Sequence, residues 1–296
     1  MKTTFYLFSF LILSSFISCN DDESINEIPQ MMENSEPLEA SFQQNVSYGN
    51  DSQQVYDLYL PANRTDEKTK VIILVHGGGW IEGDKADVTG YISLIQQNNP
   101  NHAIVNMNYR LAVIPTIPAF PNQFLDLKAV ITKLTAERET LQILPEFGLI
   151  GLSAGAHISL QYDSVYDTND QVKFVADIVG PSDFTDPFYA DNPNFSTLLN
   201  FFTDESQYPP NTNFATALSP ALQVSVRTSP TIMFYGNQDE LVPLTNGDRL
   251  NAALEANSIE HQYTVYDGGH GNWNTIQFAD VEAKLSAFIE AHLAID

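Results

Sequence analysis

The sequence predicts an α/β fold with a mostly parallel central sheet and helices on both faces. Strand-like and helix-like segments alternate along most of the 296 residues, as they do when helices connect parallel strands. Several strand-like segments are apolar at nearly every position, which is typical of strands buried on both faces. A chain of this length can form one such domain, and its 43% hydrophobic residues can supply the core.

The first half of the predicted domain opens with a strand of different character from the rest. Gln54–Leu60 alternates apolar and polar residues and ends at Pro61, which is typical of an antiparallel edge strand. The elements that follow are strands at Lys70–Val75 and Ala103–Tyr109, a helix at Asn122–Arg138, a strand at Phe147–Leu152 and a helix at Ala154–Tyr162. The helices are predicted from apolar residues at spacings of three and four.

The second half continues the alternation after an interruption. Its predicted elements are strands at Val172–Val179, Thr231–Tyr235 and Gln262–Tyr266, and helices at Leu244–Ala256 and Phe278–Leu293. The interruption, residues 182–227, is rich in Phe, Tyr, Asn and Pro, with a short helix expected at Phe195–Phe202. It is either a lid or side wall over a site, or a plain surface excursion. A site is expected at the C-terminal ends of the parallel strands.

The N-terminus has the features of an export signal. Lys2 precedes an apolar run, Phe5–Ile17, which is too short for a spanning helix and is typical of a signal peptide. The run leads to Cys19, the only cysteine, so no intrachain disulfide can form. The segment Phe16-Ile17-Ser18-Cys19 resembles the lipobox of bacterial lipoproteins, with Phe16 in place of the usual Leu. An ordinary signal peptide with a chance cysteine is the alternative.

The lipobox resemblance implies a particular domain organisation. Residues 1–18 would be removed as a lipoprotein signal peptide, and Cys19 would carry the lipid that anchors the chain to a membrane. Residues 19–45 would form a flexible acidic tether, and residues 46–296 the catalytic domain, with alternation already starting near Ser41. The acidic run Asn20–Glu23 resembles a surface-export signal of some lipoproteins. The expected location is therefore the bacterial cell envelope, at the outer membrane, and the sequence leaves open whether the protein is exposed on the surface or faces inward.

The charge of the chain excludes some partners. With 37 acidic and 13 basic residues, the formal net charge is −24, which repels nucleic acids, anionic lipids and polyanionic substrates. A neutral substrate fits this composition best. A single cysteine provides no cysteine cluster for zinc, and no metal or organic cofactor is implied.

A nucleophile is predicted at Ser153. Gly151-Leu152-Ser153-Ala154-Gly155 matches the pattern G-x-S-x-G, in which the serine occupies a strained turn from a strand into a helix. Small neighbours permit the tight packing of this turn. Three fixed positions are weak support alone, but the predicted strand before Ser153 and helix after it supply the required context.

A glycine-rich loop is predicted to stabilise negative charge. His76-Gly77-Gly78-Gly79-Trp80 directly follows a central strand, and glycines allow backbone N–H groups to turn inward. Acyl transfer develops charge on a carbonyl oxygen, which such donors stabilise. Gly77 and Gly78, with the N–H of Ala154, are the expected oxyanion hole, and Trp80 is expected to wall the substrate pocket. A phosphate-binding loop is the rival interpretation, but the lysine and spacing of known phosphate loops are missing.

His270 is the predicted base among six histidines. It lies in Asp267-Gly268-Gly269-His270-Gly271, just after the last strand, where flanking glycines let the loop present an imidazole to the site. His157 is the main competitor, but it lies on the helix beneath the serine and is expected to be structural. His76 is expected to shape the glycine loop. The others, His102, His261 and His292, are expected at the surface.

Asp239 is the predicted third member, which would orient the imidazole and stabilise its cation. It follows the strand Thr231–Tyr235 in the segment Gly236–Pro243. Glu240 beside it and the more distant Asp183 are the alternatives.

Together these motifs resemble an α/β-hydrolase esterase over residues 46–296. The resemblance is carried by His76–Trp80, Asn108-Tyr109-Arg110, Gly151–His157, Asp239 with Val242-Pro243, and His270, with the triad in the order Ser, Asp, His. It is nearest to bacterial feruloyl and acetyl xylan esterases and then to hormone-sensitive-lipase-like carboxylesterases. The lipase-like group usually has a helical cap before its first strand, whereas strand-like sequence begins directly here.

The resemblance implies a serine carboxylic-ester hydrolase that deacylates carbohydrate or other small neutral esters through an acyl-enzyme. Kynurenine formamidases share a similar H-G-G-x-W and S-A-G-A-H pattern, so amide hydrolysis stays open. A catalytically inactive binding module on the same fold is a second alternative, although no triad member is missing. A serine peptidase is a third, against which the chain lacks room for the large extra domain of common peptidase relatives.

Overall fold

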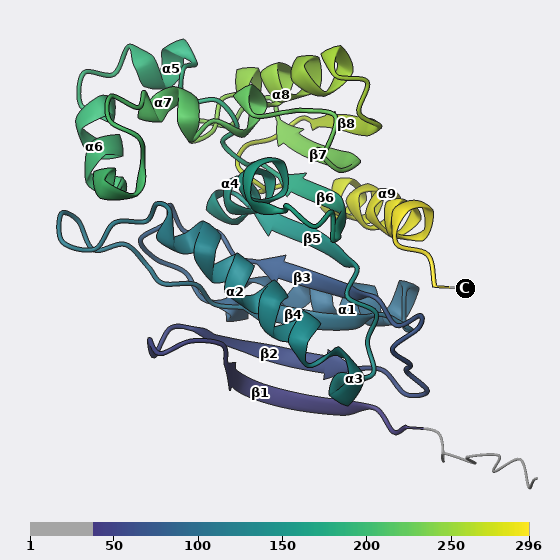
Figure 1. The fold of residues 1–296 in the computed structure, drawn as a ribbon. Helices are drawn as coiled ribbons and strands as arrows, with labels where there is room; N and C mark the ends of the chain where they lie inside the picture. Colours follow the sequence, from purple (N-terminus) through teal and green to yellow (C-terminus); the bar gives the residue numbers. More distant parts are fainter. Residues whose placement is uncertain (1–37, 296) are drawn as a thin grey trace, which may run out of the picture. The chain divides into compact units, whose positions relative to one another are not determined.

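The computed structural model describes residues 38–295 (Figure 1). Cys19, the expected signal peptide at 1–18 and most of the expected tether lie outside these residues. No helix within 38–295 combines the length and apolar character needed to cross a membrane.

The described chain folds around an eight-stranded sheet with the order β1-β2-β4-β3-β5-β6-β7-β8. The strands are β1 Ser41–Ser47, β2 Val55–Leu60, β3 Val71–Val75, β4 Ala103–Met107, β5 Phe147–Leu152, β6 Val172–Ile178, β7 Thr231–Gly236 and β8 His261–Tyr266. Strands β3 to β8 run parallel, whereas β1 and β2 pair antiparallel. This is the α/β-hydrolase architecture that the sequence predicts.

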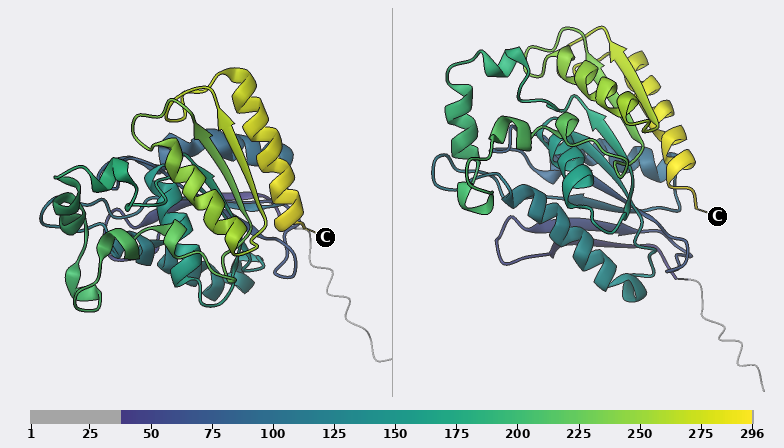
Figure 2. Two further views of the ribbon diagram at one scale, coloured as in Figure 1. Left: turned by 90° about the horizontal axis from the view of Figure 1, so that it is seen from above. Right: turned by 45° about the horizontal axis from the view of Figure 1, so that its top comes forward.

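Helices cover both faces of the sheet (Figures 1 and 2). One face carries α2 Asn122–Ala136, α4 Ala154–Gln161 and α8 Leu244–Ala256, and the other carries α1 Thr89–Asn98 and α9 Thr275–His292. The short helix α3, Arg138–Leu141, follows α2. Alternate residues of β3 enter opposite cores: Ile73 packs on the α2 side and Ile72 on the α9 side, and neither is exposed. Burial on both faces explains why this strand is an unbroken apolar run.

The prediction that Gln54–Leu60 is an edge strand is wrong. β2 lies between β4 and β1, and β1 forms the edge. Six of the seven β1 residues are exposed, so its sequence lacks a buried, apolar side that would reveal a strand. Because β1 starts at Ser41, residues 41–45 of the predicted tether belong to the sheet, and the ordered domain begins before residue 46.

Two helices also differ from expectation. α1 was not predicted, because only Ile92, Leu94 and Ile95 of its ten residues are buried. α9 starts three residues before the expected Phe278, because the side chain of Asn274 caps the helix by accepting hydrogen bonds from the N–H groups of Ile276 and Gln277.

Residues 182–227 form a group of short helices beyond the C-terminal ends of the strands (Figure 2). They comprise α5 Pro187–Ala190, α6 Phe195–Phe202, α7 Phe214–Ala217 and the single turns η3 Glu205–Gln207 and η4 Pro220–Leu222. The N–H of Phe120 donates to the carbonyl of Phe202 (2.8 Å), and the N–H of Asp204 donates to the carbonyl of Phe120 (2.8 Å). These bonds and the burial of Leu199 and Phe202 fasten the segment to the domain.

Candidate active site

Ser153 lies on a strained turn between β5 and α4. Its φ of 51° and ψ of −116° are rare for a residue with a side chain, and its N–H donates to the carbonyl of Ile178 (2.8 Å). Neighbouring glycines make the turn possible. A Cβ on Gly155 would lie 2.1 Å from the carbonyl oxygen of Val75, and one on Gly151 would lie 2.5 Å from the backbone nitrogen of Ala156. The turn therefore requires glycine on both sides of the serine.

Gly155→Ala should destabilise the domain by about 3 kcal/mol, because the added methyl group collides with backbone rather than with a movable side chain. Urea unfolding measures this change. Gly90→Ala is the matched control: a Cβ there meets nothing within 4 Å, and in α1 it should stabilise by about 0.5 kcal/mol. Equal stability of the two variants would contradict this account of the turn.

The structure brings Ser153, His270 and Asp239 into one hydrogen-bonded chain. The hydroxyl of Ser153 lies 2.9 Å from Nε2 of His270, and Nδ1 of His270 lies 2.7 Å from Oδ2 of Asp239. The Asp239 side chain is fully buried, while 22% of the His270 side chain is exposed. The serine proton can therefore pass to an imidazole whose far side is held by a carboxylate.

Asp239 is held in its ionised form. Burial alone would raise the pKa of its carboxyl group, but the hydrogen bond from His270 and those from the N–H groups of Val242 and Leu241 outweigh burial and lower the pKa. Both N–H groups donate to Oδ1, at 2.9 and 2.8 Å, which leaves Oδ2 for His270. A carboxylate fixed in this way selects the tautomer of His270 that carries its proton on Nδ1 and accepts at Nε2.

The two alternative acids lie in other surroundings. Asp183 accepts hydrogen bonds from Thr185 and forms an ion pair with Arg249 at 2.7 Å. Glu240 is exposed. Among residues 38–295, neither forms a hydrogen bond or ion pair with His270.

The glycine loop after β3 presents free backbone donors to the same cavity. Gly78 has a φ of 110°, and a Cβ there would lie 2.0 Å from the carbonyl oxygen of Glu82. Within residues 38–295, the N–H groups of Gly77, Gly78 and Ala154 donate to no other protein group. All three residues line the cavity that contains Ser153. Unpaired donors around a nucleophile are suited to bind a developing oxyanion.

Two buried side chains hold this loop in place. Nδ1 of His76 lies 2.7 Å from the backbone carbonyl oxygen of Gly77. The hydroxyl of Tyr109 donates to two backbone carbonyl oxygens, that of His76 at 3.0 Å and that of Gly77 at 3.2 Å. The two rings stack at 4.2 Å, and burial lowers the pKa of His76. Because the C=O and N–H of a trans peptide point in opposite directions, fixing the Gly77 carbonyl aims the Gly78 N–H the other way.

Tyr109→Phe should lower any turnover that depends on Ser153 by roughly fivefold, since about 1 kcal/mol of hydrogen bonding holds the glycine loop. Steady-state kinetics checks this prediction. Tyr263→Phe is the control. It removes a hydroxyl on β8 that donates a hydrogen bond to Asp248 on α8, and it should leave kcat unchanged. If Tyr109→Phe reduced only thermal stability, the loop would not depend on this hydroxyl.

Trp80 lines the cavity, but its indole N–H is already engaged. Nε1 donates to Nδ1 of His157 (3.3 Å), so His157 carries its proton on Nε2, which donates to the carbonyl of Leu218 (2.8 Å). Burial lowers the pKa of His157 to about 4, against the opposing effect of the bond to Leu218. His157 is thus a neutral link between the glycine loop, α4 and residues 182–227, with no nitrogen left for Ser153. Trp80 can offer substrate only its ring.

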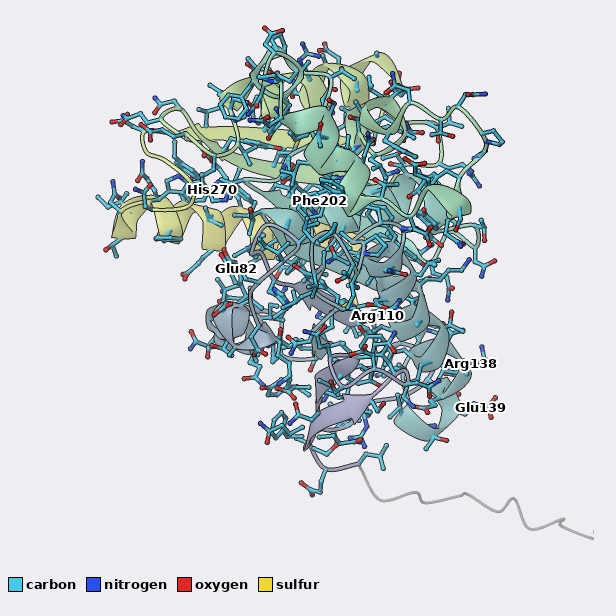
Figure 3. The ribbon with its side chains drawn as sticks, turned by 90° about the vertical axis from the view of Figure 1, so that its left-hand side faces the viewer. Glu82, Arg110, Arg138, Glu139, Phe202 and His270 are labelled. Carbon is cyan, nitrogen blue, oxygen red and sulfur yellow. The ribbon has the colours of Figure 1, made fainter. Side chains whose placement is uncertain are left out.

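The cavity around Ser153 has a volume of about 740 Å³ and crosses the ends of the strands. Tyr91 and Trp273 line it on the side of the α1 and α9 core, while Tyr189 and Phe195 line it on the side of the α2 and α4 core. Figure 3 looks onto this edge, where His270 and Phe202 lie well apart from Arg138 and Glu139.

Sequence reasoning missed several of these wall residues. Tyr91 belongs to the unpredicted helix α1. Tyr189 and Phe195 lie in residues 182–227, whose path relative to Ser153 no sequence pattern indicates, although the helix Phe195–Phe202 has its predicted bounds. The aromatic richness of residues 182–227 was the one available signal. The expectation of a surface position is wrong for His102, which is buried with Nε2 2.8 Å from the carbonyl oxygen of Leu293.

Comparison with known proteins places the chain in a family. The profile of the BD-FAE family matches residues 56–254, and the chain belongs to this family of α/β-hydrolases. Esterase LipC of Mycobacterium tuberculosis is 24% identical over 246 residues, covering 75% of this chain and 60% of its own. The isoprenylcysteine α-carbonyl methylesterase ICME of Arabidopsis thaliana is also 24% identical, and the match covers 75% of this chain and 55% of that protein. The chain thus spans little more than half the length of these relatives.

Solved structures share the fold. A truncated carbohydrate esterase from gut microbiota superposes with a TM-score of 0.67 and 19% identity, covering 84% of this chain and 98% of its own. The acetyl ester-xyloside bifunctional hydrolase of Caldicellulosiruptor lactoaceticus superposes with a TM-score of 0.68 and 18% identity, covering 88% of this chain and 98% of its own. At these identities the likeness establishes the fold.

Proposed function

We propose that this protein is a serine carboxylic-ester hydrolase. The observation that carries the proposal is the chain of hydrogen bonds from Ser153 through His270 to Asp239, at 2.9 and 2.7 Å, set on a strained turn. Free N–H groups line the cavity in front of the serine. Nucleophile, base, orienting acid and oxyanion donors are the complete set that acyl transfer requires. The esterase names of the relatives agree with it.

The geometry supports a two-step reaction. Ser153 Oγ attacks the ester carbonyl carbon while Nε2 of His270 takes its proton. The N–H groups of Gly77, Gly78 and Ala154 bind the oxyanion of the tetrahedral intermediate. His270 then protonates the departing alcohol, leaving an acyl-enzyme. A water molecule, deprotonated by His270, attacks the acyl group and releases the acid and free Ser153.

The proposed substrates are carbohydrate or other small neutral esters. A net charge of −24 disfavours anionic substrates, and the carboxylates of Glu82 and Asp87 also line the cavity. Structures that share the fold include a carbohydrate esterase and an acetyl ester-xyloside hydrolase. The ring of Trp80 would wall the pocket next to the oxyanion loop.

Activity on four substrates tests the reaction class. Acid release from acetylated xylan, methyl ferulate, p-nitrophenyl acetate and an aryl formamide should depend on Ser153, with the esters preferred. Preference for the aryl formamide would replace the ester hydrolase with an amide hydrolase of the same fold. Absence of Ser153-dependent turnover on all four would favour a binding module.

We further propose that a lipid on Cys19 holds the protein in the bacterial cell envelope, and that this N-terminal anchor is its only attachment to a membrane. The lipobox-like segment before Cys19 motivates this proposal. Cys19→Ala should abolish incorporation of labelled palmitate during expression in bacteria and release the protein from membranes. Unchanged membrane association of this variant would contradict the anchor.

A further inference from the structure

A second cavity of about 750 Å³ adjoins the catalytic cavity. All of its lining residues lie between positions 184 and 215, so it belongs to the segment that interrupts the α/β alternation. Tyr189 and Phe195 line both cavities, with ring centroids 4.9 Å apart. The wall between the two spaces therefore includes two aromatic side chains.

The second cavity has one charged lining residue and is rich in hydrogen-bonding groups. Glu205 is the only charged residue among those that line it. Amide and hydroxyl side chains occur instead, from Asn200, Asn211, Ser196 and Thr212, beside the rings of residues such as Phe214. Amides and hydroxyls bond sugar hydroxyl groups, and aromatic faces pack against the C–H faces of sugar rings. The catalytic cavity differs, since aromatic and aliphatic side chains such as Tyr91 and Trp273 line it together with the acids Glu82 and Asp87.

Three polar groups in the second cavity are available for a ligand. Ser196 and Asn200 lie one turn apart on the exposed side of α6, and Tyr189 stands in the shared wall. Across residues 38–295, none of these side chains forms a hydrogen bond to another protein group. Pairs at positions i and i+4 of a helix face the same way, so Ser196 and Asn200 can bind one ligand together.

We propose that the second cavity is the subsite for the alcohol part of the substrate, and that this part is a neutral polyhydroxylated chain such as an oligosaccharide. The chain would pass the rings of Tyr189 and Phe195 to reach Ser153. The acyl group would occupy the apolar side of the catalytic cavity near Tyr91 and Trp273. This inference rests on the proposed hydrolysis of carbohydrate esters and adds to it the place where the alcohol part of the substrate binds.

Filling the subsite tests the inference. Ser196→Trp places a large ring in the second cavity from an exposed helix position. It should lower the ratio of kcat/KM for acetylated xylo-oligosaccharide to that for p-nitrophenyl acetate at least tenfold. Thr197→Trp is the matched control, because Thr197 is the next exposed residue of α6 and lines neither cavity. It should leave the ratio unchanged. Asn200→Ala, which removes a hydrogen-bonding group without adding bulk, should raise KM for the oligosaccharide severalfold.

The outcomes separate the two proposals. An unchanged ratio in both Ser196→Trp and Asn200→Ala would overturn the subsite, as would equal losses in Ser196→Trp and Thr197→Trp. Wild-type protein that cleaves p-nitrophenyl acetate but not the oligosaccharide would overturn the subsite and leave the ester hydrolase standing. Failure to cleave any ester in a Ser153-dependent way would overturn both. Binding can be measured without turnover in Ser153→Ala. If this variant binds deacetylated xylo-oligosaccharide and the double variant Ser153→Ala/Ser196→Trp does not, the result supports the subsite.

Discussion

Replacing Ser153 with alanine should lower kcat for p-nitrophenyl acetate by about four to six orders of magnitude. The variant keeps the oxyanion donors and the cavity but has no atom that can form the acyl-enzyme. Because the hydroxyl of Ser153 bonds only to His270 among the described residues, its loss should leave the fold and the binding of product nearly unchanged. Stopped-flow and steady-state kinetics measure the effect.

The control for this variant is Ser206→Ala, a hydroxyl deletion on the exposed turn η3 at a residue that does not line the cavity containing Ser153 and His270. Its kcat should equal that of wild type. Near-normal turnover by Ser153→Ala would show that the esterase reaction uses another nucleophile or none.

Asp239→Asn should lower kcat by about four orders of magnitude while preserving the size and burial of the side chain. Two backbone N–H groups fix Oδ1 as an acceptor, so the amide nitrogen would occupy the position that faces His270. An amide donor there requires Nδ1 to accept, which places the imidazole proton on Nε2 and removes the base from Ser153. The variant should therefore be folded and inactive.

Glu240→Gln is the matched control for Asp239→Asn. It makes the same chemical change one residue away, at an exposed residue that forms no hydrogen bond or ion pair with His270 among residues 38–295. Wild-type kcat is expected. If Glu240→Gln lost most of its kcat while Asp239→Asn stayed active, Glu240 rather than Asp239 would be the acid that orients His270.

Much of the fold can be read from the sequence because buried parallel strands form continuous apolar runs. Phe147–Leu152 and the helix Leu244–Ala256 have the predicted bounds. β1 was not predicted because an exposed edge strand has no buried face to impose a pattern. Asn45 lies in its bulge with a φ of 53° and interrupts the register further. α1 was not predicted because it buries few side chains, so its sequence lacks a clear apolar face.

The site divides in the same way. Ser153 and the glycine loop carry local signatures, since the strained turn and the positive φ of Gly78 demand particular residues. His270 and Asp239 follow strands whose ends must meet at one edge of the sheet, so their proximity was predictable. Tyr189 in the cavity wall was not, because the path of residues 182–227 depends on tertiary contacts rather than on local pattern.

Covalent labelling tests the central claim most directly. Intact protein treated with an alkyl p-nitrophenyl phosphonate should gain the mass of one phosphonyl group, and peptide mapping should place it on Ser153. The adduct should be absent from Ser153→Ala and form far more slowly in His270→Gln, because the base that activates the serine is missing. No adduct, or an adduct on another residue with Ser153 unmodified, would contradict the account.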